Sequence, residues 1–133
     1  MKSFLIDLDG VLYVGKEIVN GAKECLKLLE NLGYHYRFVS NSTRRSRRSV
    51  AERLKSLGYD IPAEQIFTPS LAAIEHINRS MVNRCFLLTT GDVNSDFESS
   101  GIIISEENVN FVIVGDAGKD FTYERLNKAL TLY

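Results

Sequence analysis

The stretch that most constrains this chain is FLIDLDGVLY at residues 4–13, where a short apolar run is followed at once by two carboxylates and a glycine. Its β-prone phenylalanine and isoleucine predict a buried strand over residues 3–6. Asp7 and Asp9 follow that strand, and Leu8 between them would point away, so both acids can face one ligand. In an open parallel α/β sheet, ligands bind outside the carboxyl ends of the strands. The stretch therefore predicts a reactive turn in an α/β protein.

Gly10 supports an anion site at this turn. A glycine lets the backbone turn sharply and approach an anion with no Cβ atom in the way. The same D-x-D-G pattern also occurs in calcium-binding loops. An EF-hand loop, however, would place another Asp or Asn at the position of Val11, and it would not begin inside an apolar strand. We therefore favour an anion site over a calcium site.

The composition is that of one soluble globular domain. Of 133 residues, 44% are hydrophobic and 25% are charged, with a net charge of −1, which argues against nucleic acid or an anionic membrane as the main partner. No apolar run approaches membrane-spanning length, and the N-terminus lacks the features of a signal peptide. Cys25 and Cys85 lie far apart in apolar surroundings, which predicts buried thiols in a reducing compartment. We therefore expect a cytoplasmic protein without nucleic-acid or membrane partners.

Strand and helix patterns alternate along the chain. Helices are expected over residues 19–32, 45–57, 69–79 and 122–133, and further strands over residues 34–39, 85–88, 101–104 and 111–114. A strand, a helix and a second strand make a right-handed crossover with parallel pairing. We expect Ser42 or Thr43 to cap the second helix, and Asp92 to cap a short helix that runs to Phe97. The alternation predicts a doubly wound parallel α/β sheet.

The motif DLDGVLY at residues 7–13 resembles the first motif of the haloacid dehalogenase (HAD) superfamily, and its Val-Leu-Tyr ending is similar to the NagD and p-nitrophenyl phosphatase branch. Three later segments resemble the same branch in the same order, at residues 50–58, 64–68 and 121–130. The resemblance covers essentially the whole chain. It implies the N-terminal half of a Rossmann-like HAD core over residues 1–80 and the beginning of an α/β cap domain over residues 81–133.

The resemblance also implies roles for five residues. Asp7 would be the nucleophile that accepts the phosphoryl group, and Asp9 the general acid that protonates the leaving oxygen and then activates water. Asp7 through its side chain and Asp9 through its backbone carbonyl would also bind Mg²⁺. Ser40, which follows an apolar strand, resembles the second motif, whose hydroxyl and backbone donate to the phosphoryl group. Asn41 would support the substrate site, and Gly10 would line it.

Members of the family complete their site with a lysine and a late G-D-x-x-x-D motif that binds Mg²⁺, both located after the cap. The segment at residues 114–120 superficially matches this acidic motif through Asp116 and Asp120. The adjoining residues 121–130 resemble the start of the cap, which favours a connection between core and cap instead. The resemblance therefore implies a Mg²⁺-dependent phosphatase of small phosphorylated metabolites that works through an aspartyl phosphate and is incomplete in this chain.

Two other hypotheses stay open. One is a non-catalytic phosphate-binding module, derived from such a phosphatase, that self-associates as a homo-oligomer through exposed sheet edges. The other is a receiver-like phosphoacceptor, although that fold gathers its acids from several strands and needs no acid two residues after the acceptor. We interpret the arginine-rich run at residues 44–48 as a solvated surface and not as a substrate contact, because cations near the start of a helix are locally unfavourable.

Overall fold

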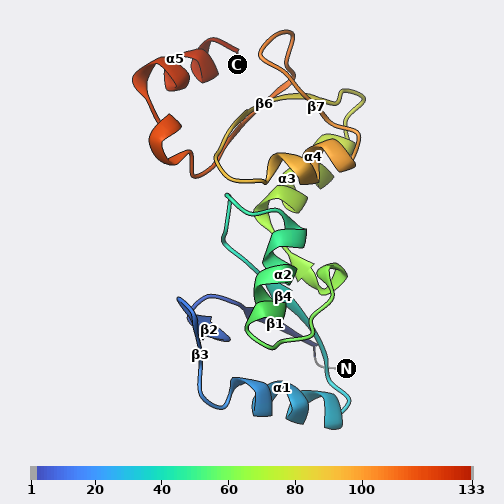
Figure 1. Cartoon of the computed structure of the whole chain (residues 1–133). Helices are drawn as coiled ribbons and strands as arrows, with labels where there is room; N and C mark the ends of the chain where they lie inside the picture. The colour runs from blue at the N-terminus through green and yellow to red at the C-terminus, as the bar shows by residue number, and fades with distance from the viewer. Residues whose placement is uncertain (1–2, 133) are drawn as a thin grey trace. The chain divides into compact units, whose positions relative to one another are not determined.

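The computed structural model describes residues 3–132 and divides the chain into two compact units (Figure 1). The first unit contains residues 3–41 and Val50–Phe67, and the second contains Ser42–Ser49 and residues 68–132. Each unit holds a three-stranded parallel sheet, which confirms the predicted parallel α/β class. Tyr133, the expected end of the last helix, lies outside the described residues.

The first unit is built on a sheet with the strand order β1-β4-β5. Its strands are β1 (Ser3–Asp7), β4 (His35–Val39) and β5 (Ile66–Phe67), and its other elements are the antiparallel pair β2 (Tyr13–Val14) and β3 (Glu17–Ile18), the helix α1 (Ala22–Asn31), most of the helix α2 (Arg47–Ser56) and the 3₁₀ turn η1 (Ala63–Gln65). The fully buried Phe38 of β4 packs in one cluster with Ala22 of α1 and with Leu54 of α2. Both helices therefore cover the same face of this sheet.

Two predictions for the first unit are wrong. β1 was expected to be buried, but Leu5 is 76% exposed and Phe4 is 39% exposed. Cys25 is also exposed, because the side of α1 that packs against the core passes through Ala22 and Leu26.

The hairpin of β2 and β3 replaces the polar turn expected at residues 13–17. Its two-residue loop places Gly15 at the first central position with a φ of +59°, as a type II′ turn requires.

The second unit surrounds the central strand β6 (Arg84–Leu88), with β7 (Ile103–Ile104) on one side and β8 (Phe111–Val114) on the other. Its helices are α3 (Pro69–Asn78), α4 (Asn94–Ser99) and α5 (Tyr123–Leu132), and η2 (Gly118–Asp120) is a 3₁₀ turn. Cys85 packs in one cluster with α3 and α4, whereas Phe86 and Leu88 pack in another with α5. This sheet is therefore covered on both faces, and burial raises the pKa of the Cys85 thiol to about 11.

The helix α2 begins two residues later than predicted, and Ser46 caps it in place of Ser42 or Thr43. The Ser46 hydroxyl accepts the N–H of Ser49 at 3.1 Å. The carboxylate of Asp92 in turn accepts the N–H of Ser46 at 3.0 Å and the hydroxyls of Ser46 and Ser49. Asp92 thus serves the start of α2 with its side chain, whereas it was expected to cap the short helix that follows it.

A second carboxylate at the start of α2 belongs to Asp96, which accepts the N–H of Arg47 at 3.0 Å. Anions are favourable at the positive end of a helix. Asp92 and Asp96 therefore offset the unfavourable placement of the arginine-rich run at residues 44–48.

The Asp92 contacts predict a pH-dependent stability. Burial alone would raise the pKa of this carboxyl group, but hydrogen bonds from Ser49 and Ser46 outweigh it and lower the pKa to about 2. A pKa below the unfolded value of about 3.9 stabilises the fold above that pH, and the contribution is lost as the pH falls toward 2. Because Asp92 is partly exposed, we expect Asp92→Asn to lower the free energy of unfolding at pH 7 by only about 1–2 kcal/mol.

The measurement is urea unfolding of the wild type and Asp92→Asn between pH 7 and pH 3, with the exposed Asp60→Asn as the matched control. The difference in the free energy of unfolding between the wild type and Asp92→Asn should shrink below about pH 4. A difference that stays constant over this range would contradict the assignment.

Candidate active site

The predicted residues Asp7 and Ser40 lie at the ends of neighbouring strands. Asp7 is the last residue of β1 and pairs in register with Val39, the last residue of β4. Because the two strands are parallel, their carboxyl ends meet at the same edge of the sheet. Asp9 follows two residues after the end of β1, and Ser40 follows β4 directly. The first unit therefore brings Asp7, Asp9 and Ser40 to one end of its sheet.

The loop after β1 is closed by its own hydrogen bonds. Leu8 is 1% exposed, so its side chain points into the core while Asp9 is exposed, as the alternation predicted. The Leu8 carbonyl accepts the N–H of Leu12 at 2.9 Å, and the N–H of Gly10 donates to the Tyr13 carbonyl at 2.7 Å. Gly10 has a φ of +85°, and a Cβ atom added there would meet nothing within 4 Å. The backbone conformation of the turn, not lack of space, is what calls for glycine here.

Two side chains from elsewhere in the first unit, which the sequence analysis did not predict, donate hydrogen bonds to backbone carbonyls of this loop and of the hairpin that follows it. The buried hydroxyl of Tyr59 donates to the Leu12 carbonyl at 2.8 Å. Arg53 donates from Nη2 to the Gly15 carbonyl at 2.6 Å, and its guanidinium lies 4.9 Å from the centre of the Tyr13 ring. No local pattern marks either residue, because their partners lie 47 and 38 residues away in the sequence.

The Asp7 carboxylate accepts a hydrogen bond from the neighbouring backbone. The Oδ1 atom of Asp7, which is half-buried, accepts the N–H of Leu8 at 2.8 Å. This contact orients the Asp7 carboxylate through one of its two oxygens.

Ser40 is tied into the sheet through its backbone. Its N–H donates to the Phe67 carbonyl at 3.0 Å, which extends the pairing of β4 with β5. The backbone N–H of Ser40, which the resemblance expected to donate to the phosphoryl group, is therefore engaged within the sheet. Asn41 is exposed and is the last residue of the first unit before the chain enters the second.

The later acidic segment belongs to the second unit. The N–H of Asp116 donates to the Thr43 hydroxyl at 2.8 Å, and its carboxylate lies 3.7 Å from Nη1 of the exposed Arg44. Asp120 lies in η2. Over residues 3–132, no three or more His, Cys, Asp or Glu side chains are grouped so that they could hold a metal ion.

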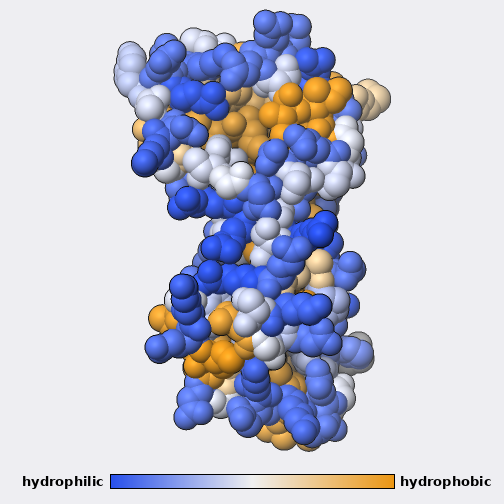
Figure 2. All heavy atoms as spheres, in the orientation of Figure 1, coloured by the Kyte–Doolittle hydropathy of each residue, from blue (hydrophilic) through white to orange (hydrophobic). Residues whose placement is uncertain are grey.

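Exposed apolar side chains occur on both units (Figure 2), among them Leu5 and Leu28 in the first and Leu130 in the second. None of the helices in the described part of the chain combines the length and the apolar character needed to cross a membrane.

Comparison with known proteins places these features in a wider group. A family model described as haloacid dehalogenase-like hydrolase matches residues 4–103, a range that includes Asp7, Asp9, Gly10, Ser40 and Asn41. The 5′-nucleotidase YutF of Bacillus subtilis is 36% identical over 127 residues, which cover 93% of this chain and 48% of that protein. An acid sugar phosphatase of Staphylococcus aureus is 30% identical over 127 residues, which cover 94% of this chain and 49% of that protein.

A solved structure also matches nearly the whole of this chain. The 4-nitrophenylphosphatase of Thermotoga maritima matches with a TM-score of 0.88 at 32% identity, covering 98% of this chain and 50% of that one. The chain thus spans about half the length of the relatives that it matches.

Proposed function

We propose that this chain, which belongs to the haloacid dehalogenase-like hydrolase family and to its NagD and p-nitrophenyl phosphatase branch, contributes the nucleophile of a magnesium-dependent phosphatase. The observation that carries the proposal is the placement of Asp7 and Ser40 at the carboxyl ends of two adjacent parallel strands, beside a glycine turn that carries Asp9. A carboxylate nucleophile, a general acid and a neutral donor are the groups that phosphoryl transfer through an aspartyl phosphate requires.

The reaction would proceed in two steps. In the first, a carboxylate oxygen of Asp7 attacks phosphorus, the bond from phosphorus to the leaving oxygen breaks, and Asp9 gives its proton to that oxygen. In the second, the Asp9 carboxylate takes a proton from water, and the oxygen of that water attacks phosphorus. The bond from phosphorus to the Asp7 oxygen breaks, so inorganic phosphate leaves, the Asp7 carboxylate is regenerated and Asp9 again carries a proton. The Ser40 hydroxyl would donate to a phosphoryl oxygen throughout.

The donor set at the turn suits Mg²⁺. The Asp7 carboxylate and the Asp9 carbonyl are hard oxygen ligands, and Mg²⁺ in proteins commonly uses one or two carboxylates together with waters and substrate phosphate. When bound, Mg²⁺ would neutralise charge on the phosphoryl oxygens. Asp116 and Asp120 are not part of the proposed ligand set, because the residues that follow them resemble the start of the cap.

The substrate would be a small phosphate monoester. The matched relatives bear the names of a 5′-nucleotidase, an acid sugar phosphatase and a 4-nitrophenylphosphatase, so nucleotides and sugar phosphates are the natural candidates. We also propose that residues 81–133 begin a cap domain, as the resemblance implies. The two free cysteines are compatible with a reducing compartment, and the proposal accordingly places the chain in the cytoplasm.

The test is phosphate release from p-nitrophenyl phosphate, a nucleoside 5′-monophosphate and a sugar phosphate, with Mg²⁺ and with a chelator. It uses the chain alone and the chain mixed with the part of the B. subtilis relative that the match does not cover. Release that needs Mg²⁺ in either sample supports the proposal. Phosphate binding without release in both samples would favour the non-catalytic module instead.

A further inference from the structure

The turn that carries Asp9 is joined by backbone contacts to the hairpin of β2 and β3. The Gly10 N–H donates to the Tyr13 carbonyl at 2.7 Å, and Asp9 forms an isolated β-bridge with Tyr13. Tyr13 is the first residue of β2. The backbone position of Asp9 and Gly10 therefore depends on where β2 lies.

The hairpin is too small to hold itself in place. β2 and β3 have two residues each, and Val14, Glu17 and Ile18 are exposed. An isolated two-stranded hairpin is at best marginally stable in water. Contacts from outside the hairpin are therefore needed to fix its position.

Two side chains supply such contacts, one at each end of β2. The Tyr59 hydroxyl donates to the carbonyl of Leu12, the residue before β2, at 2.8 Å. Arg53 donates from Nη2 to the carbonyl of Gly15, the residue after β2, at 2.6 Å. The Arg53 guanidinium also lies 4.9 Å from the centre of the Tyr13 ring, which is within the range of a favourable cation–π contact.

Both side chains come from a well-packed part of the first unit. Arg53 lies in the last turn of α2, and Tyr59 follows the end of that helix by three residues. Tyr59 is buried, and its N–H donates to the carbonyl of Leu54 at 3.0 Å. Leu54 is itself fully buried in the core. The core of the unit therefore fixes the two donors, and the donors fix β2.

The placement of Asp9 decides whether it can act as an acid. A general acid contributes to a rate only when its proton lies within hydrogen-bond reach of the leaving oxygen. A displacement of about 1 Å can lower a rate about a hundredfold. Asp9 is exposed, so the backbone of the turn, and not the packing of its side chain, determines where its carboxyl group lies.

We propose that Arg53 and Tyr59 are positioning residues for the reaction. They hold β2, β2 holds the turn, and the turn keeps the Asp9 carboxyl group where it can protonate the leaving oxygen. The proposal rests on the proposed function, in which Asp9 is the general acid. It adds that the rate depends on two side chains that act through the backbone of the loop.

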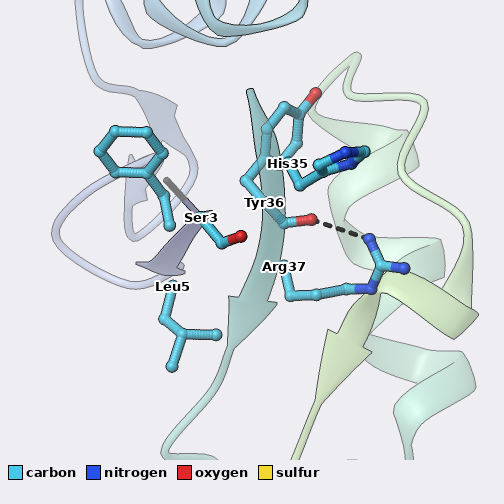
Figure 3. Close-up of a pocket in the computed structure, with 6 residues that line it drawn as sticks. Ser3, Leu5, His35, Tyr36 and Arg37 are labelled. Carbon is cyan, nitrogen blue, oxygen red and sulfur yellow. Dashed lines mark hydrogen bonds between the residues drawn. The ribbon is translucent and has the colours of Figure 1, made fainter. Parts of the chain in front are cut away.

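The first measurement is amide hydrogen exchange at Gly10, followed by NMR in the chain alone. Tyr59→Phe removes one hydroxyl group, and Arg53→Met removes the donors of Arg53 while it keeps an unbranched side chain. The control is Tyr36→Phe, because Tyr36 lies on β4 (Figure 3) and its hydroxyl donates to Glu30 at 2.7 Å. We expect exchange at Gly10 to become at least about fivefold faster in the first two variants and to stay unchanged in the control.

The second measurement compares two substrates, with the chain alone or mixed with the B. subtilis part, whichever releases phosphate. p-Nitrophenolate leaves readily without a proton, whereas a sugar alkoxide needs one from Asp9. We expect Tyr59→Phe and Arg53→Met to lower kcat/KM about tenfold for a sugar phosphate and less than about threefold for p-nitrophenyl phosphate. A loss of folded protein would lower both values equally, so the difference between the substrates reports the position of the acid.

If exchange at Gly10 is unchanged in either variant, that residue does not hold the turn and the proposal for it fails. An equal loss of kcat/KM for the two substrates, or no loss for either, would also overturn the proposal. The wild type tests the proposed function separately. No phosphate release by any wild-type sample would contradict that function, and the exchange rates would then decide alone whether Arg53 and Tyr59 hold the turn.

Discussion

Replacing Asp7 with Asn should lower phosphate release at least about a thousandfold, in whichever sample releases phosphate. The amide of Asn has nearly the shape of the carboxylate, but it is a poor nucleophile and cannot form the acyl phosphate. The neighbouring Leu8 N–H can still donate to the amide oxygen, so the local fold should persist. The rate constant is measured with p-nitrophenyl phosphate at saturating Mg²⁺.

The matched control for this prediction is Asp60→Asn, an exposed aspartate of the same unit in the loop between α2 and η1. It should release phosphate at the rate of the wild type. If Asp7→Asn kept more than about a tenth of the rate, Asp7 would not be the nucleophile.

Replacing Phe38 with Ala should lower the free energy of unfolding by about 3–5 kcal/mol. Phe38 is fully buried in the core of the first unit, and its ring meets that of Tyr36 edge to face with centroids 5.4 Å apart. The substitution leaves a cavity between the sheet and the helices α1 and α2, two residues before Ser40. Urea unfolding followed by circular dichroism gives the free energy.

Phe121→Ala removes the same atoms from a side chain that is 54% exposed, so it should cost less than about 1 kcal/mol. Equal losses for the two variants would show that the cluster around Phe38 does not stabilise the first unit as described.

Much of the fold could be predicted because its signals are local. The apolar residues of β4 and β6 and the glycines that end the helices mark their elements within a few positions, and β1 leads directly to Asp7. The parallel register then follows from the order of the elements, which is why Asp7 and Ser40 were expected at one edge.

What could not be predicted depends on partners far along the chain. The Asp92 carboxylate pairs with Ser46, 46 residues earlier, and the Tyr59 hydroxyl with Leu12, 47 residues earlier. The sequence around Asp92 is typical of the start of the helix that follows it, and it does not reveal that the carboxylate accepts hydrogen bonds at the start of α2 instead. The composition of a strand also cannot say whether another element covers both of its faces, so the exposure of Leu5 was not foreseen.

The most direct test of the central claim is to trap the phosphoryl group on Asp7. The variant Asp9→Asn keeps the nucleophile but lacks the base that activates water, so the acyl phosphate should accumulate. After incubation with p-nitrophenyl phosphate and Mg²⁺, an acid quench and peptide mass spectrometry locate the modification. We predict a phosphoryl group on Asp7 that is absent from the double variant Asp7→Asn, Asp9→Asn. Phosphate release by Asp9→Asn at the wild-type rate, or a phosphoryl group on another residue, would contradict the account.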